Sequence, residues 1–398
     1  WNREQSENGT QKTKKAGLDF YTEDLLSKWR FNTANTITDA GRMADTDRQT
    51  ASFLPTENVY GQSRSRLREH DLTIVSNNTL NLDFGNENSL VKSTSLQMTL
   101  NVSYRNNRSS LWSRTMESEM PFGSLTDQTI LLPFNHLCEQ YNALLNYSGL
   151  SDEKHRHQFN AGGNLSLLHR LKNSGDMLSG SINWDCQDEN TTSFIQNTVG
   201  YPRTGQMTDY RHNNQRTPVK GASISVGSDY QLTGAGGWNY TFNVGYRHRY
   251  RSSDRSLFNL HKLIGWGIDS SHGLTELPST RDEMQTVQDM RNSYYSSTYA
   301  DDGEMGLKAF YWHQWGNGTN LNTSVRIPFS FQYDKLKYRR NFIDTTLTRT
   351  NRFLQPVVYF DLQLPKNNTL HLDCRLTKSA PSLVNWLDIR DDVNPLNI

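Results

Sequence analysis

Residues 238–250 of this 398-residue chain read WNYTFNVGYRHRY. From Trp238 to Tyr250, every second residue is aromatic, valine or histidine, and the positions between them hold only polar residues or glycine. A period of two predicts a two-faced β-strand. Its polar face ends in three arginines, Arg247, Arg249 and Arg251, which a soluble sandwich would not bury. We therefore predict a strand with lipid on one side and water on the other, as in the wall of a membrane barrel.

The composition fits such a wall. Hydrophobic residues make up 34% of the chain and aromatic residues 11%, whereas a globular domain usually has about 45–50% apolar residues, with glycine counted. A barrel needs apolar residues only at alternate strand positions. The formal net charge of +1 gives no reason to expect a nucleic-acid partner.

The other bulk features narrow the class of protein further. No apolar run approaches the about 18 residues of a membrane helix, and no signal peptide is visible. Cys138, Cys186 and Cys374 lack the spacing of a zinc module, although a Cys138–Cys186 disulfide stays open. The chain starts at Trp1 rather than Met, so we expect that the true N-terminus is missing.

Six hairpins are expected from alternating segments that flank short polar turns. The turns lie at 23–27, 85–88, 173–176, 234–237, 316–318 and 365–368. Long polar connections are expected at 38–70, 106–156, 188–219, 252–303 and 335–352. A change of parity between Val75 and Leu80 predicts a β-bulge.

Short turns at one rim and long loops at the other are typical of outer-membrane barrels. The predicted fold is therefore all-β: an antiparallel up-and-down transmembrane β-barrel, partial, with about twelve strands, short periplasmic turns and long extracellular loops. Residues 1–398 would form this one domain. A soluble propeller or sandwich is the alternative, but no repeat of about 40–50 residues is evident.

The end of the chain carries a family resemblance. Residues 377–383 (TKSAPSL) and 391–398 (DDVNPLNI) resemble a segment of the TonB-dependent receptor-like outer-membrane β-barrel proteins of Bacteroidota. The resemblance implies a cell outer membrane location and import of a bulky nutrient, such as a glycan, peptide or metal chelate. It also implies an N-terminal plug and about 22 strands, so that this chain would be an internal barrel fragment without plug or closing strands. The implied partners are the TonB complex, through the missing N-terminal region, and a surface lipoprotein in a glycan importer.

A second function class stays open: a barrel that serves as a surface scaffold or adhesin without transport. No G-x-S-x-G, Walker loop or H-E-x-x-H motif occurs, so we expect neither an enzyme nor a cofactor.

Strand parity predicts which side chains contact solute or plug and which contact lipid. The polar-side candidates are Arg105, Asn183, Asp185, Asp229, Asn243, Arg247, Arg249, Arg251, Arg326 and Gln332. The expected lipid-facing aromatic belt is Tyr104, Trp184, Trp238, Tyr240, Tyr246, Tyr250 and Tyr333. The arginines at 105, 247, 249 and 251 would lie near the extracellular end, where they would favour anionic ligands or pair with plug and loop carboxylates.

Weaker candidates lie in the expected loops. Arg64, Arg66 and Arg68 would meet lipopolysaccharide phosphates if they face the membrane. His155 and His157 beside Asp152 and Glu153 have metal-ligand chemistry, but a solvated loop explains them as well. Asp301, Asp302 and Glu304 suit calcium or a simple Asp-Asp-Gly turn, and Asp391 and Asp392 carry the same ambiguity. Trp112, Trp266, Tyr294, Tyr295 and Tyr299 would stack on sugar rings or pack the loops together.

Overall fold

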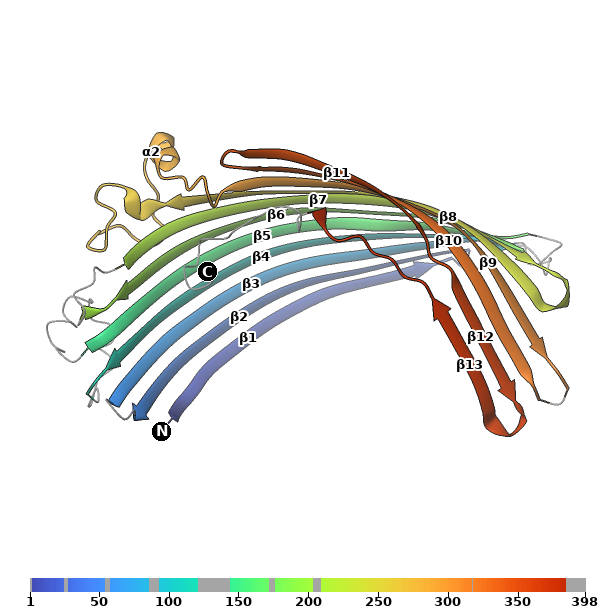
Figure 1. Cartoon of the computed structure of the whole chain (residues 1–398), viewed down its shortest axis with the longest axis horizontal. Helices are drawn as coiled ribbons and strands as arrows, with labels where there is room; N and C mark the ends of the chain where they lie inside the picture. Colours follow the sequence, from blue (N-terminus) through green and yellow to red (C-terminus); the bar gives the residue numbers. More distant parts are fainter. Residues whose placement is uncertain are drawn as a thin grey trace.

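The computed structural model describes residues 2–24, 28–53, 58–85, 93–120, 144–171, 176–202, 209–316 and 318–383. Within them, thirteen strands form one antiparallel sheet that arches over its length (Figure 1). The strands are β1 (Asn2–Glu23), β2 (Trp29–Phe53), β3 (Asn58–Gly85), β4 (Ser93–Ser118), β5 (Leu144–Arg170), β6 (Met177–Gly200), β7 (Asp209–Thr233), β8 (Trp238–Asn259), β9 (Tyr294–Gln314), β10 (Asn320–Arg340), β11 (Ile343–Leu354), β12 (Val357–Leu364) and β13 (Asn368–Arg375).

Apart from β11 and β12, each strand pairs with its neighbours in sequence, which confirms the up-and-down topology. Among the described residues β1 is not paired with β12 or β13, so the sheet is open and a closed barrel is not shown. The count is thirteen rather than about twelve because β11 and β12 both pair with β10 and are separated only at 355–356. Pro356 has no N–H to give to the ladder, and the N–H of Gln355 donates to the carbonyl of Pro328 at 3.2 Å.

The six predicted hairpins are present, since the strands on either side of each turn are paired. The β7–β8 turn shows why the glycines at 234–237 are needed: Gly236 and Gly237 have φ of 71° and 91°. A Cβ on Gly237 would lie 2.2 Å from the carbonyl oxygen of Trp312. Only glycine combines this backbone conformation with so close an approach.

Most of the predicted long loops are wrong, because the strands continue through them. β2 and β3 run to Phe53 and from Asn58, β4 and β5 run to Ser118 and from Leu144, and β10 and β11 are joined at 341–342. The residues there are polar on both faces, but a strand between two neighbours is held by backbone hydrogen bonds whatever its side chains. Residues 54–57, 121–143 and 203–208 of the expected loops lie outside the described residues.

The predicted bulge between Val75 and Leu80 is also wrong, since β3 keeps one register against β4 throughout. Ser76 and Asn78 simply occupy the apolar parity there. The Asn78 amide donates to the Ser76 hydroxyl at 3.1 Å and to the Leu100 carbonyl at 3.4 Å, so the two polar side chains satisfy each other.

One long connection, residues 260–293, is described, and it has a small core of its own. It contains the 3₁₀ turn η4 (Leu260–Lys262) and the helix α2 (Arg281–Thr286), which begins with a capping box formed by Thr280 and Glu283. Leu260, Trp266 and Val287 are buried against one another. No helix in the described part of the chain has the length and apolar character to span a membrane.

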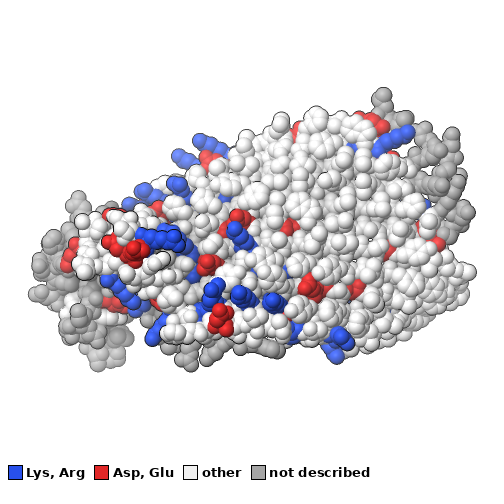
Figure 2. All heavy atoms as spheres, turned by 90° about the horizontal axis from the view of Figure 1, so that it is seen from above, with Lys and Arg blue, Asp and Glu red and all other residues white. Residues whose placement is uncertain are grey.

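The register divides the sheet into two faces. We call the face that carries Phe242, Val244 and Ile327 the apolar face, and the opposite face, which carries Asn243 and Arg326, the polar face. Large hydrophobic side chains are exposed on the apolar face, as with Val244 at 57% and Met305 at 59%. Seen from above (Figure 2), the arch bears few charges over much of its surface, and charged residues gather toward the end at which α2 lies in Figure 1.

Candidate functional site

A row of polar side chains crosses the polar face at mid-sheet. Strand register pairs these residues one after another, from β6 to β10: Asn183, Ser225, Arg247, Asp302 and Gln332. Alternation on each strand brings all of them to the same face. The row therefore presents amide, hydroxyl, guanidinium and carboxylate groups side by side.

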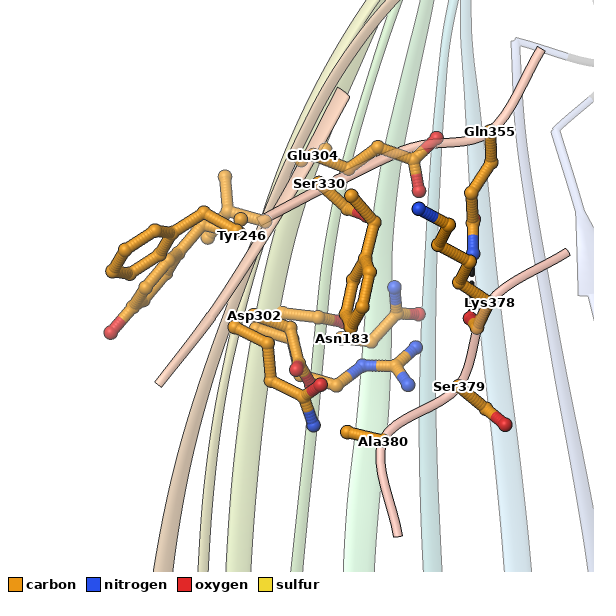
Figure 3. A pocket seen from close by; sticks show the side chains of 18 of the residues that line it. Asn183, Tyr246, Asp302, Glu304, Ser330, Gln355, Lys378, Ser379 and Ala380 are labelled. Atoms are coloured by element: carbon orange, nitrogen blue, oxygen red, sulfur yellow. Dashed lines mark hydrogen bonds between the residues drawn. The ribbon is translucent and has the colours of Figure 1, made fainter. Parts of the chain in front are cut away.

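The next row toward the short turns lacks side chains at its centre. It consists of Ser181, Gly227, Gly245, Glu304 and Ser330. Gly227 and Gly245 are direct partners across the β7–β8 ladder, so two adjacent positions have no Cβ. A hollow of about 590 Å³ lies over these two rows (Figure 3).

The chain itself covers this hollow after β13. We call residues 376–383 the crossing segment, and Lys378, Ser379 and Ala380 line the hollow opposite the sheet (Figure 3). The Gln355 amide donates to the Lys378 carbonyl at 2.7 Å, and the N–H of Leu376 donates to the Pro356 carbonyl at 3.1 Å. These bonds tie the start of the crossing segment to the junction between β11 and β12.

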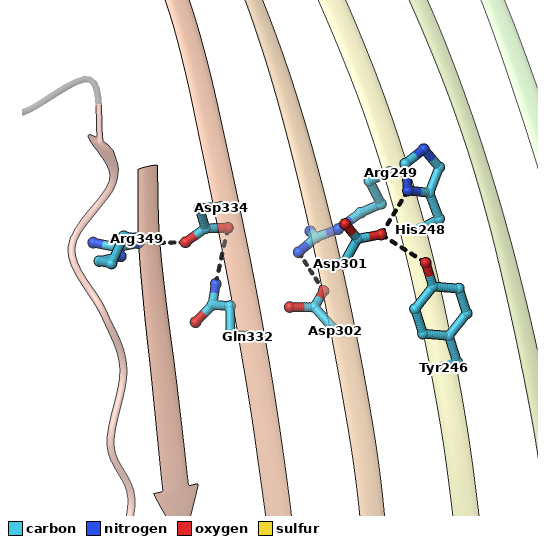
Figure 4. A network of polar contacts seen from close by, with 8 residues as sticks. All are labelled: Tyr246, His248, Arg249, Asp301, Asp302, Gln332, Asp334 and Arg349. Atoms are coloured by element: carbon cyan, nitrogen blue, oxygen red, sulfur yellow. Dashed lines mark hydrogen bonds and ion pairs between the residues drawn. The ribbon is translucent and has the colours of Figure 1, made fainter. Parts of the chain in front are cut away.

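The far end of the crossing segment is fixed by burial. Leu383 packs against Leu336 and Tyr338, which are 0% and 3% exposed, and Leu347 lies against the same cluster. Arg349 donates a hydrogen bond to the Pro381 carbonyl and forms an ion pair of 2.6 Å with Asp334 (Figure 4). This end of the polar face is thus closed by packed side chains rather than open to solvent.

The hollow carries an excess of positive charge. Its two carboxylates are already paired on neighbouring strands: Asp302 with Arg249 at 2.6 Å (Figure 4), and Glu304 with Arg326 at 2.7 Å. Among the described residues, Arg247 and Lys378 have no ion-pair partner, and the Lys378 side chain extends toward Glu304 (Figure 3). A planar guanidinium and an ammonium that face one cavity favour an anionic group between them.

The register places all ten polar-side candidates on the polar face. Asn183, Arg247 and Gln332 line the hollow, while Arg249, Arg326 and Asn243 contact its carboxylates. Asp185 accepts a hydrogen bond from Ser223, and Asp229 accepts one from Ser179 at 3.4 Å. The last two candidates are not part of the hollow: Arg251 lies farther along β8, and Arg105 lies on β4.

The four predicted rim arginines therefore do not form one cluster. Arg105 is separated from β8 by three strands and pairs with Asp71 at 2.8 Å. Arg249 pairs with Asp302, as a charged rim usually does with nearby carboxylates. Only Arg247 of the four reaches the hollow.

Sequence reasoning missed Gly227, Gly245, Gln355 and the lining role of Lys378. The two glycines had a usable signal, because they stand nine residues on either side of Gly236 in a hairpin whose register is symmetric about that turn. No periodic pattern in the sequence predicts the path of the crossing segment.

The expected aromatic belt residues all lie on the apolar face, with Trp184 and Trp238 each 39% exposed. Asp301 shares this face and is not part of an Asp-Asp-Gly turn, since it lies within β9. Its carboxylate accepts hydrogen bonds from the Tyr246 hydroxyl at 2.6 Å and from His248 Nδ1 at 2.7 Å (Figure 4). A carboxylate on an apolar face is thereby given two polar partners.

Most of the weaker candidates lie in strands rather than in the expected loops. His155 and His157 lie in β5, and His155 pairs with Glu153 at 2.8 Å. Trp266 is buried in the 260–293 core, whereas Trp112, Tyr294, Tyr295 and Tyr299 belong to strands. Within the described ranges, no group of three or more His, Cys, Asp or Glu side chains is arranged to hold a metal ion. Cys186 and Cys374 are free, and Cys138, Asp391 and Asp392 lie outside the described residues.

Comparisons with known proteins give little. No protein-family model matches the chain, and no curated protein matches it. Among solved structures, the chain is similar to the crystal structure of the ferric citrate transporter FecA in its unliganded form, with 7% sequence identity and a TM-score of 0.19. The match covers 92% of this chain and 65% of that chain. A likeness this weak supports no conclusion about substrate or mechanism.

Proposed function

We propose that this chain forms the wall of an outer-membrane transporter of the TonB-dependent receptor type, with the polar face toward the path of an imported nutrient. The observation that carries the proposal is the covered hollow with its unpaired Arg247 and Lys378. The charge balance favours a bulky anionic nutrient, such as an acidic peptide or an anionic metal chelate, over a neutral glycan. We propose no enzymatic activity and no cofactor for this chain.

The orientation in the membrane follows from the two faces. The exposed aromatic and aliphatic side chains of the apolar face would contact lipid, and the short turns would face the periplasm. TonB and, for some nutrients, a surface lipoprotein would be the protein partners, as the sequence resemblance implies.

Lipid-embedded tryptophans test this orientation. The full chain is reconstituted in vesicles that contain phosphatidylcholine brominated on its acyl chains. Fluorescence should be quenched, and Trp184→Phe or Trp238→Phe should each reduce the quenched fraction. Trp266→Phe is the matched control, because Trp266 lies in the 260–293 core away from the belt. A quenched fraction that neither belt substitution reduces would contradict the orientation.

Matched peptides test the hollow. The full chain should bind triglutamate at least about tenfold more tightly than triglutamine, since a charge-assisted hydrogen bond contributes about 1.5–3 kcal/mol. Arg247→Gln should abolish this preference. Arg251→Gln is the control, because Arg251 lies on the same strand and face but outside the hollow. Equal affinity of the unchanged chain for the two peptides would overturn the anionic-nutrient proposal.

The surface scaffold or adhesin remains the alternative, favoured by the length of the strands. β3 has 28 residues, whereas only about 9–11 residues of a strand are needed to cross a membrane. At about 3.3 Å per residue, most of its length would therefore project beyond the membrane. A non-transporting barrel would show the lipid quenching and bind neither peptide.

A further inference from the structure

We propose a second binding site, on the apolar face beyond the aromatic border, that holds the phosphate of an anionic lipid headgroup. The inference rests on the membrane orientation proposed above and is independent of the hollow. It starts from a basic group on β1 to β4 that we call the basic shelf: Lys12, Arg68, His70 and Arg108.

The register brings these side chains together. One row across β1 to β5 reads Lys12, Gly41, His70, Arg108 and His155, and the next reads Thr10, Met43, Arg68, Ser110 and Glu153. Because Gly41 has no side chain, a hollow of about 390 Å³ opens among the basic groups. All of these positions share the parity of Ile74 and Tyr104, so they face the same way as the belt.

Three of the four basic groups of the shelf are uncompensated. Asp39 pairs with the fourth, His70, at 2.7 Å, and the carboxylate of Glu153, which lines the hollow, pairs with His155 at 2.8 Å. Lys12, Arg68 and Arg108 are exposed and have no ion-pair partner within the described ranges. Two guanidinium groups and one ammonium around a hollow are suited to a phosphate, which guanidinium groups bind in a bidentate manner.

The height of the shelf selects a lipid over a soluble anion. His70 lies four residues beyond Ile74, which pairs with Tyr104 at the aromatic border. Four residues span about 13 Å along a strand, or about 10 Å along the membrane normal at a tilt near 40°. That is the headgroup level, and below it Leu72, Ile74 and Ala16 offer an apolar surface to acyl chains. The ligand class is therefore a phosphorylated lipid such as the lipid A part of lipopolysaccharide.

The experiment compares diphosphorylated lipid A with its dephosphorylated form, bound to the full chain in mixed micelles and measured by native mass spectrometry. The unchanged chain should prefer the phosphorylated lipid at least about tenfold. The double variant Arg68→Gln/Arg108→Gln should lose most of that preference. Gly41→Leu should weaken binding without removing a charge, since a Cβ at Gly41 meets only the Glu69 carbonyl at 3.9 Å.

Arg66→Gln is the matched control, because Arg66 lies on the same strand and face but already pairs with Asp45 at 3.1 Å. An unchanged preference in the double variant overturns the site. So does displacement of the lipid by an equal concentration of inorganic phosphate, which would identify free phosphate as the ligand. Failure of the bromolipid quenching overturns both this site and the proposed orientation, whereas quenching without phosphate preference overturns the site alone.

Discussion

Gly227 and Gly245 face each other across the β7–β8 ladder on the polar face, and the space left by their missing side chains is part of the hollow. Neither glycine has a positive φ, so neither is required by its backbone conformation. A Cβ on Gly245 would meet only the Val226 carbonyl at 3.9 Å, and one on Gly227 would meet Ser181 Oγ at 3.5 Å. The absence of side chains here creates space without relieving a steric clash.

Filling the space at these two glycines should weaken ligand binding and leave the fold intact. Gly245→Val is expected to lower the affinity for triglutamate at least about tenfold. The fold should be kept, because valine is favourable at strand positions. Isothermal titration measures the affinity, and heat-induced unfolding checks the fold. Gly303→Val is the control, because Gly303 lies on the apolar face and a Cβ there meets nothing within 4 Å. Equal affinity of the two variants would mean that the hollow binds no ligand.

The Asp334–Arg349 ion pair should contribute more to the free energy of unfolding than the Asp302–Arg249 pair at the hollow. Its side chains are only 14% and 11% exposed. Asp334→Asn breaks this buried ion pair from one side, which costs about 3 kcal/mol or more in the free energy of unfolding.

Chemical denaturation of the full chain in micelles measures this cost. Asp302→Asn is the comparison, because the Asp302–Arg249 pair is 32% and 49% exposed and such pairs contribute less than about 1 kcal/mol. A cost below about 1 kcal/mol for Asp334→Asn would show that Arg349 does not depend on this carboxylate.

The sequence was sufficient for the turns and the faces, and insufficient for the strand lengths. Turn residues such as 234–237 act locally, and the alternation from Trp238 to Tyr250 separates the apolar face of the strand from the polar face. In the proposed orientation, both faces of a strand such as β3 would meet a polar medium beyond the belt, so no apolar alternation is needed there although the backbone ladder continues. Polarity alone then predicts a loop where a strand exists.

The candidate site divides in the same way. Asn183, Arg247 and Gln332 could be assigned to one face by parity, but their meeting in one row depends on the register of five strands. The cover depends on the path of the crossing segment, which is set by the burial of Leu383 against Leu336 on a distant strand. Such long-range contacts leave no local periodicity.

The anchor at Leu383 gives a prediction about the cover itself. Leu383→Ala should loosen the end of the crossing segment, since truncating a buried leucine costs about 2–5 kcal/mol. Trypsin cleavage after Lys378 should then be at least about tenfold faster, as proteolysis follows the population of opened chain. Leu376→Ala is the control, because Leu376 is 47% exposed. Identical cleavage rates for the two variants would contradict a role of Leu383 in holding the cover.

The 260–293 connection should hold its structure at neutral pH and lose it as the pH falls, because its partly buried groups His261 and Asp289 have lowered pKa values. Burial lowers the pKa of His261, so its neutral form is favoured in the folded state. Partial burial would raise the pKa of Asp289, but hydrogen bonds from Asn292, Asn259 and two backbone N–H groups outweigh it and hold that pKa below the usual value.

Both shifts have the same sign for stability. A group with a lowered pKa in the folded state stabilises the fold above its unfolded pKa and loses that contribution as the pH falls toward its folded value. The His261 contribution should therefore decline below about pH 6.5, and the Asp289 contribution below about pH 4. The difference in fluorescence between the unchanged chain and Trp266→Phe follows the state of this core, in which Trp266 is 7% exposed. His261→Gln should reduce the first decline and keep the second, because His212, whose pKa burial also lowers, lies with its ring 5.8 Å from that of Trp266 and shares the first decline. A first decline of unchanged size in this variant would assign it to His212 alone.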